Sequence, residues 1–565
     1  MLHKLLLVLT VGLFFLVGCS KAAQPTAAPP AATSTPRAAA AAPPAGTGAA
    51  PTSRIPDAST PRPKGGKLVR LGSDPITLDP HQAGDTTAAT ILVEVFGGLV
   101  TIDPDLKIVP DLAERWDVSA DGRVYTFHLN PKAKFHDGRQ VVAEDVRWSL
   151  ERAADPRTQS PVADTYLGDI VGVKEKLGGK AQTVSGVRVV NDRTIEIAID
   201  APKAYFLAKM TYPTAFVLDR KNVESDARTW SRRPNGTGPF KLTEYRLGQT
   251  LRLTANESYH LGAPHLAEVE FILSGGSRML MYENNEIHLA GVGLADLERV
   301  RDPQNPLNKE LRRVPPEFDI SYIGFNVTKP PFDDPKIRMA MNLVIDKKSI
   351  ATQVGQDLIA PATGVLPPGF PGFNPALKGY EYNLEKARQL LKESKYGGNM
   401  AQFPPVTLSL SGELGASVGL DTEVILQAWQ QELGITVEVQ QTEFATFLQD
   451  LHQKRYQMFM TAWIADYPDP QNFLDVLLHS QSNNNHGNYS NPQVDRLLEQ
   501  ARVEPDQAKR FQQYQTIEQM VLDDAPWVPL WYSGEGFVLI KPNVHDFLLT
   551  PLIIPRLRFV YLTPQ

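Results

Sequence analysis

The chain has 565 residues, of which 57 are Lys or Arg and 63 are Asp or Glu, so its formal net charge at pH 7 is −6. A mildly acidic chain without basic clusters is not typical of a nucleic-acid-binding protein, and no nucleic-acid partner is expected. The single cysteine excludes an internal disulfide, so the fold must be stabilised by core burial.

The amino terminus has the pattern of a secretory signal. Lys4 precedes an apolar run of 13 residues from Leu5 to Val17, which is too short to span a bilayer, since a span takes about 20 residues. The run ends in Leu-Val-Gly-Cys19, which resembles the lipobox of bacterial lipoproteins. We expect residues 1–18 to be removed and Cys19 to be lipidated, which would hold the protein outside the cytoplasm, in the periplasm or at the cell surface. The alternative is an ordinary signal peptide with an incidental cysteine.

Residues 19–64 are expected to form a tether. Positions 20–64 contain 15 Ala and 10 Pro and no hydrophobic period, so little apolar burial could offset the entropy of folding. About 500 residues follow, which is too long for one core and predicts two or three domains.

The body alternates between strand and helix patterns. Apolar residues recur at every second position in five predicted strands, at 123–130, 194–200, 268–274, 406–412 and 435–441. Helical spacing occurs at 143–154, 334–345 and 422–434, and the last of these stops at Gly434. Strands and helices mix throughout, so the predicted fold class is α/β, or mixed α+β.

Six segments in chain order resemble one family, the extracytoplasmic solute-binding proteins of ABC importers, family 5, whose members bind oligopeptides, dipeptides or nickel complexes. The start of the body, GGKLVRLGSDPITLDPHQAGD, is similar to the family's first strand and Leu-Asp-Pro turn. The most specific likeness lies in residues 95–155, around DGRVYTFHLNPKAKFHDGRQVVAEDV. The others are PNGTGPFKL, YIGFNVTKPPFDDPKIRMAMNLVIDKKSI, NYSNPQVDRLLEQA and APWVPLWY.

The resemblance implies a two-lobed clamp of the periplasmic-binding-protein type with an inserted domain. Lobe I would combine residues 65–110, 210–315 and 530–565, the inserted domain would be 111–209, and lobe II would be 316–529. Closure of the lobes about a hinge is the expected motion.

Two aspartates stand three residues apart in TAWIADYPDPQNFL, residues 461–474. Asp469 precedes Pro470 and is predicted to cap a helix. No capping role is predicted for Asp466. It follows a predicted buried strand, Met458 to Trp463, so we expect it at a strand end that faces a cleft. The structural alternative is that Asp466 accepts backbone amides of its own turn.

The resemblance implies a ligand role for Asp466, because the Asp of a similar Trp-x-x-Asp segment pairs with the peptide α-ammonium in peptide-binding members. Some tripeptide-preferring members place a basic residue six positions earlier, where this chain has Met460. An extended peptide would bond through its backbone to the strand and to an amino-terminal loop, with aromatic side chains walling its pockets. The predicted ligand-binding residues are Ala462, Trp463, Ile464, Asp466, Tyr467, Tyr322, Gly84, Asp85 and Thr86.

No catalytic, cofactor or metal site is predicted. The chain lacks Gly-x-Ser-x-Gly and His-Glu-x-x-His, so it is not expected to be an enzyme. His479 and His486 flank Asn483 to Asn485 with a spacing that fits no compact zinc pattern, which favours a polar surface loop.

The resemblance therefore implies a monomeric lipoprotein that captures an extended oligopeptide and delivers it to a membrane permease. The permease and ATPase subunits would be other chains, and the protein itself would need no cofactor. One alternative is the same fold with a nickel chelate, an oligosaccharide or another solute. A second alternative is a sensory or adhesion lipoprotein without transport.

Overall fold

The computed structural model describes residues 62–356, 358–412 and 416–564. The predicted signal, Cys19 and most of the tether lie outside these residues. The described residues belong to one compact unit, residues 53–565. Within them, none of the helices has the length and apolar composition of a membrane span.

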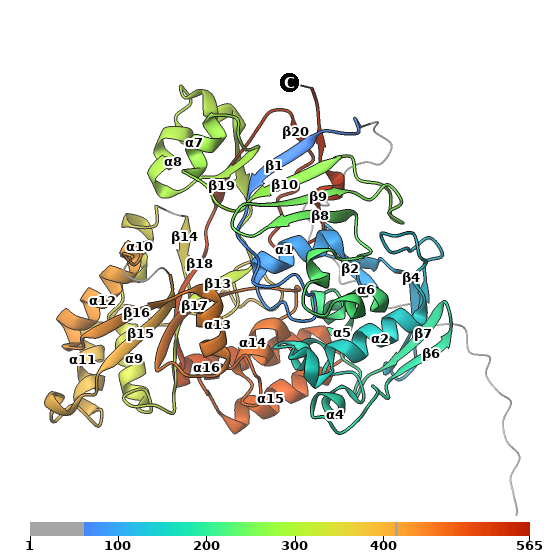
Figure 1. The fold of residues 1–565 in the computed structure, drawn as a ribbon. Coiled ribbons are helices and arrows are strands. Elements are labelled where there is room, and N and C mark those ends of the chain that lie inside the picture. Colours follow the sequence, from blue (N-terminus) through green and yellow to red (C-terminus); the bar gives the residue numbers. More distant parts are fainter. Residues whose placement is uncertain (1–61, 357, 413–415, 565) are drawn as a thin grey trace, which may run out of the picture. The chain divides into compact units, whose positions relative to one another are not determined.

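A four-stranded sheet has the order β1-β10-β9-β8, in which β1 is parallel to β10 and the other pairs are antiparallel (Figure 1). A three-stranded antiparallel sheet, β11-β19-β12, lies in the same region of Figure 1. The strands are β1 (Lys67–Leu71), β8 (Phe240–Arg246), β9 (Thr250–Ala255), β10 (Glu268–Ile272), β11 (Leu289–Gly291), β12 (Leu311–Val314) and β19 (Gly536–Ile540). Helix α1 (Thr86–Val95) packs its apolar side into the core of the first sheet.

A second four-stranded sheet is antiparallel throughout, with the order β4-β5-β7-β6. Its strands are β4 (Ala113–Val118), β5 (Val124–Leu129), β6 (Val187–Asn191) and β7 (Thr194–Ala198). Tyr125, Phe127 and Leu129 all point into the core, which confirms the predicted alternation. Helix α2 (Ala143–Ala153) covers this sheet at β6 and β7.

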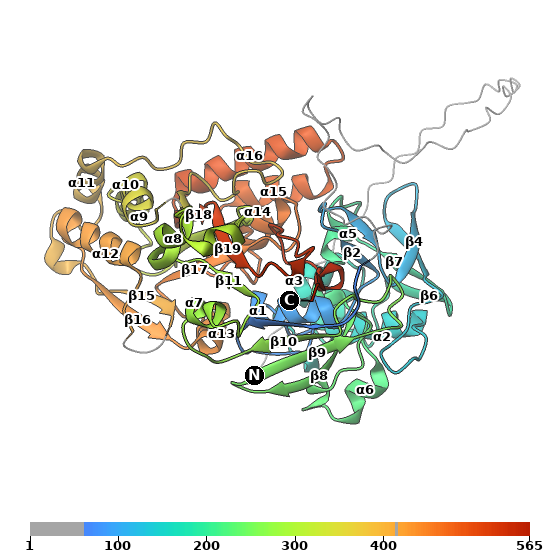
Figure 2. The same cartoon turned by 90° about the horizontal axis from the view of Figure 1, so that it is seen from above.

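The largest sheet has six strands in the order β14-β18-β13-β17-β15-β16. These are β13 (Asp319–Phe325), β14 (Ile359–Pro361), β15 (Val406–Ser411), β16 (Val437–Thr442), β17 (Met458–Ile464) and β18 (Trp527–Ser533). Alternate residues of β13 and β17 belong to two different cores, so helices cover both faces of the sheet. One face carries α9 (Pro335–Leu343), α10 (Lys347–Gln353), α11 (Leu384–Glu393) and α12 (Leu420–Leu433). The other carries α13 (Phe444–His452), α14 (Gln471–Leu478), α15 (Pro492–Val503) and α16 (Gln507–Asp524), as Figure 2 shows from above.

Shorter elements complete the described part of the chain. The remaining α-helices are α3 (Ala163–Leu167), α4 (Val173–Leu177), α5 (Phe206–Lys209), α6 (Arg220–Ser225), α7 (Arg278–Glu283) and α8 (Leu294–Arg301). Two strand pairs stand apart from the larger sheets, β2 (Val100–Ile102) with β3 (Ile108–Pro110) and β20 (Val544–His545) with β21 (Tyr561–Leu562).

The chain enters the six-stranded sheet after β12 and leaves it after β18 to form β19. Residues 530–533 were expected in lobe I, but they pair within the six-stranded sheet. The reason is that Trp531 is registered with Ser321 of β13, and Ser533 with Ile359 of β14. The second passage between sheets therefore lies between Ser533 and Gly536.

Candidate functional site

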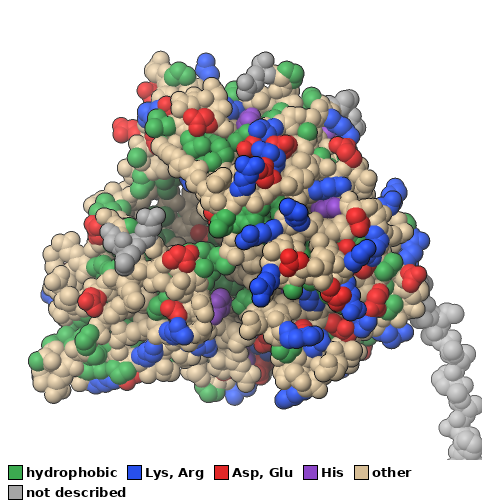
Figure 3. Space-filling view, viewed as in Figure 1, with side chains coloured by type: hydrophobic (Ala, Val, Ile, Leu, Met, Phe, Trp, Pro, Cys, Tyr) green, Lys and Arg blue, Asp and Glu red, His purple; other side chains and the backbone are tan. Residues whose placement is uncertain are grey.

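A cavity of about 340 Å³ opens between the end of β17, the start of α1 and the helix α13. Its lining combines residues that are far apart in the chain, from the loop at Gly84 to Ile553 and Pro555. The space-filling view in Figure 3 shows a hollow in this unit with hydrophobic side chains inside it. Of the predicted ligand-binding residues, all but Tyr467 line the cavity: Gly84, Asp85, Thr86, Tyr322, Ala462, Trp463, Ile464 and Asp466.

Asp466 stands just beyond the last residue of β17, as expected for a residue at a strand end. Its backbone N–H donates to Asn472 Oδ1 over 3.0 Å, and the Asn472 side-chain amide donates to Asp466 Oδ2 over 3.0 Å. Trp463 Nε1 also donates to Asn472 Oδ1, over 3.2 Å. Asn472 is fully buried in the first turn of α14, so this helix holds the carboxylate and the indole in place. Nothing in the sequence pattern distinguishes Asn472 from an ordinary first-turn residue.

The second partner of the Asp466 carboxylate comes from a distant part of the chain. The Tyr166 hydroxyl, on α3, donates to Asp466 Oδ2. The Tyr166 ring stacks on Tyr212 with centroids 3.7 Å apart, and both tyrosines line the cavity. The carboxylate therefore accepts hydrogen bonds from two neutral side chains, rather than from amides of its own turn.

No lysine or arginine in the described ranges forms an ion pair with Asp466. Burial raises the pKa of the Asp466 carboxyl to about 6, and the hydrogen bonds from Tyr166 and Asn472 act in the opposite direction. A carboxylate that is desolvated and lacks a cation gains most from a positively charged group that enters from the cavity.

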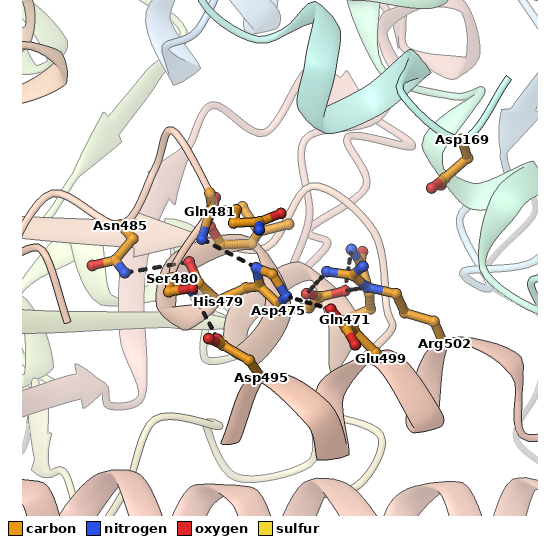
Figure 4. Close-up of polar contacts among 12 residues, drawn as sticks. Asp169, Gln471, Asp475, His479, Ser480, Gln481, Asn485, Asp495, Glu499 and Arg502 are labelled. Carbon is orange, nitrogen blue, oxygen red and sulfur yellow. Dashed lines mark hydrogen bonds and ion pairs between the residues drawn. The ribbon is translucent and has the colours of Figure 1, made fainter. Parts of the chain in front are cut away.

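Tyr467 does not line the cavity, which corrects the prediction that it walls a ligand pocket. Its side chain is fully buried, and its hydroxyl donates to Gln471 Oε1. Gln471 in turn donates to Asp475, which receives two bonds of 2.7 Å from the Arg502 guanidinium (Figure 4). Tyr467 faces this buried network because the strand has already ended, and side chains no longer alternate there.

Asp469 has a structural role, as predicted, with a partner that the sequence did not indicate. Its carboxylate accepts the backbone N–H of Gln471 over 3.0 Å, so it caps a helix that begins at Gln471, after Pro470. It also forms an ion pair with Arg510 of α16. Asp469 is thus committed to the fold, whereas Asp466 faces the cavity.

The prediction of a polar surface loop around His479 and His486 is wrong. Both histidines are buried, as are Asn484 and Asn485. The segment is buried because its side-chain amides satisfy other polar groups. Asn485 donates to the carbonyl of His479 (Figure 4). It also donates to the carbonyl of Tyr489. His486 lines the cavity.

The comparisons with known proteins assign the fold and the family. The description "Bacterial extracellular solute-binding proteins, family 5 Middle" matches residues 107–485. A probable deoxycholate-binding periplasmic protein of Escherichia coli, YgiS, is 31% identical over 495 residues, which cover 84% of this chain and 89% of the relative. The periplasmic oligopeptide-binding protein OppA of the same organism is 29% identical over 500 residues, 85% of this chain and 89% of the relative.

A solved structure, that of the E. coli murein tripeptide binding protein MppA, superposes with a TM-score of 0.77 at 26% identity and covers 88% of this chain and 99% of that one. This likeness confirms the predicted fold class, a mixed α/β two-lobed clamp. The matched family consists of solute-binding transport proteins rather than enzymes, and its described relatives are extracytoplasmic. The chain therefore belongs to family 5 of the bacterial extracellular solute-binding proteins.

Proposed function

We propose that this protein is the substrate-binding lipoprotein of an ABC importer, which captures an extended oligopeptide by hinge closure and delivers it to a membrane permease. The observation that carries the proposal is Asp466, a carboxylate in the cavity wall whose partners are Tyr166 and Asn472, both neutral. The α-ammonium of a peptide is a cation of suitable size for this position. Pairing with it would compensate the carboxylate for the hydration that it loses on burial.

The edge of β17 supports an extended ligand. On one side, β17 is registered with β13 along its whole length, from Met458 to Ile464. On its other side, β15 pairs only with Met458 and Phe459. The backbone of Ala462 to Ile464 is thus outside the β15 ladder and faces the cavity, where a peptide strand could add to it.

The membrane attachment and the domain limits belong to the same proposal. Lipidation at Cys19 and the tether through residue 64 would hold the body near the membrane. We propose lobe I from residues 65–110, 210–315 and the chain after Ser533, the inserted domain from 111–209, and lobe II from 316–533. The sheets support that division, because the larger sheets each draw their strands from only one of these three parts.

A bile acid is the second candidate ligand, because the 31% identical relative is named as a probable deoxycholate-binding protein. Aromatic and aliphatic groups in the cavity wall, among them Trp463, Phe447 and Leu451, would suit a steroid body. The lining offers no guanidinium or ammonium for the bile-acid carboxylate within the described residues, and this favours the peptide.

Calorimetric titration of the full-length protein tests the proposal. The ligands are di- to hexapeptides, the same peptides with an acetylated amino terminus, and deoxycholate. We expect free-amine peptides to bind, N-acetylation to abolish binding, and Asp466→Asn to weaken binding at least tenfold. Asp506→Asn is a matched control, because Asp506 caps the distant helix α16 and Asn can replace it as a cap. Binding of deoxycholate alone, or indifference to N-acetylation, would reject the peptide assignment.

A further inference from the structure

The charged side chains in the described cavity lining are acidic. The described lining residues include Asp85, Asp111 and Asp466, but neither lysine nor arginine. Asp111 already has a partner, because His260 Nε2 lies 2.9 Å from its carboxylate. Asp85 and Asp466, by contrast, have no Lys, Arg or His side chain within ion-pair distance among the described residues.

Asp85 is the helix cap of α1 and accepts the Ala88 N–H over 2.9 Å. Burial raises its pKa, and backbone hydrogen bonds oppose that shift. The negative charges of Asp85 and Asp466 both act on the Tyr212 hydroxyl, whose pKa they raise in addition to burial. The two acids thus contribute to one negative region around Tyr212.

A further polar group in the wall is the imidazole ring of His486. His486 is 8% exposed, and neither of its ring nitrogens has a hydrogen-bond partner. Its ring lies edge-on to His452, with centroids 5.4 Å apart, and near Phe459. Burial lowers the pKa of His486, and the nearby His452 and Lys454 lower it further, so the ring is neutral at pH 7. Lys454 itself does not line the cavity.

A neutral imidazole offers one N–H donor and one acceptor nitrogen. A carboxamide, or a peptide group, offers one acceptor and at least one donor, so it can bond either ring nitrogen of His486. Both nitrogens are buried, so this bond requires the side chain to turn one of them toward the cavity. A carboxylate offers acceptors only. It would enter a desolvated space beside two aspartates that have no ion-pair partner, and the described lining contains no lysine or arginine.

We propose that the cavity selects a solute that carries an amine and places no carboxylate inside the cavity. The ammonium would pair with Asp466, and a neutral amide would bond His486. The inference rests on the proposed function and adds to it a ligand class. Among peptides, the favoured ones are short peptides with a carboxamide terminus and longer peptides whose carboxylate lies outside the cavity. Free short peptide acids and anionic steroids are disfavoured.

The test is a matched series of one tripeptide, Ala-Leu-Phe, prepared as the free acid, as the carboxamide, and as the N-acetyl carboxamide. Each is titrated calorimetrically into the full-length protein at pH 7. We expect the carboxamide to bind at least tenfold more tightly than the acid, and the N-acetyl carboxamide not to bind. His486→Phe should reduce the preference for the carboxamide severalfold. His545→Phe is the control, because His545 lies outside the cavity, against Tyr561.

The outcomes distinguish the pairing of the peptide ammonium with Asp466 from the exclusion of carboxylates. If acid and carboxamide bind equally while N-acetylation abolishes binding, the Asp466 pairing stands and the carboxylate exclusion is overturned. If the acid binds better and Lys454→Met removes that advantage, Lys454 supplies a cation and the exclusion is again overturned. If no member of the series binds, the peptide assignment fails and this inference fails with it. The wild-type comparison decides the question even if a His486 variant does not fold.

Discussion

Peptide affinity should depend on pH through Asp466. Burial raises the pKa of this carboxyl to about 6, so about nine-tenths of the molecules carry the carboxylate at pH 7 and about one-tenth at pH 5. A peptide α-ammonium, with a pKa near 8, stays charged at both values. If the ammonium binds only the carboxylate, the affinity should fall about tenfold from pH 7 to pH 5, or about 1.4 kcal/mol.

The sign is opposite for the stability of the ligand-free protein. The folded pKa of Asp466 lies above the ordinary value of 3.8, so the folded state holds the proton more tightly than the unfolded state. The free energy of unfolding should therefore fall as pH rises from about 4 to about 6, and change little above that for this group.

Calorimetry of one free-amine peptide at half-unit steps between pH 5 and pH 7 measures the effect. Asp466→Asn keeps the shape of the side chain and removes its titration, so its weaker affinity should be nearly constant over this range. Asp85, whose pKa burial also raises, is present in both proteins, and any slope that remains in the variant belongs to such other groups. A wild-type affinity that does not change, or an equal slope in the variant, would refute the ion-pair argument.

Three further predictions concern stability. Burial raises the pKa of Glu518 to about 7 from 4.5, so the free energy of unfolding of the wild type should fall by up to about 3 kcal/mol as pH rises through that interval. Glu518→Gln should flatten the pH profile of Tm. An unchanged profile would contradict this. Gly324→Ala places a Cβ 2.3 Å from the Phe459 ring and should cost about 1–3 kcal/mol in urea unfolding, whereas a neutral effect would mean that the sheet yields. Asp475→Ala leaves the Arg502 guanidinium without its buried partner and should lower the free energy of unfolding by about 3 kcal/mol. Arg313→Ala, in the exposed pair with Glu535, should lower it by less than about 1 kcal/mol. Equal losses would refute the role of burial.

Local patterns in the sequence were enough for several strands and helices. The strand at Tyr125, Phe127 and Leu129 was predictable because alternation depends only on neighbouring residues and one buried face. The helix that ends before Gly434 was predictable because glycine there takes φ +68°, which other residues rarely adopt. Both features are encoded within a few residues.

The partners of the site were not predictable in this way. Tyr166 lies 300 residues before Asp466, and no local pattern connects them. An asparagine in the first turn of a helix is common, and the role of Asn472 depends on the turn between β17 and α14. His486 stands in an Asn-rich stretch that favours the surface, yet the amide of Asn485 bonds backbone carbonyls and lets the segment be buried. Tertiary packing decided each case.

The most direct measurement is a crystal structure of the protein with its tightest-binding peptide. The account predicts the peptide amine nitrogen within about 3 Å of an Asp466 carboxylate oxygen and the peptide backbone paired to Ala462–Ile464. A ligand whose amine lies elsewhere in the cavity, or whose carboxylate occupies the position beside Asp466, would contradict it.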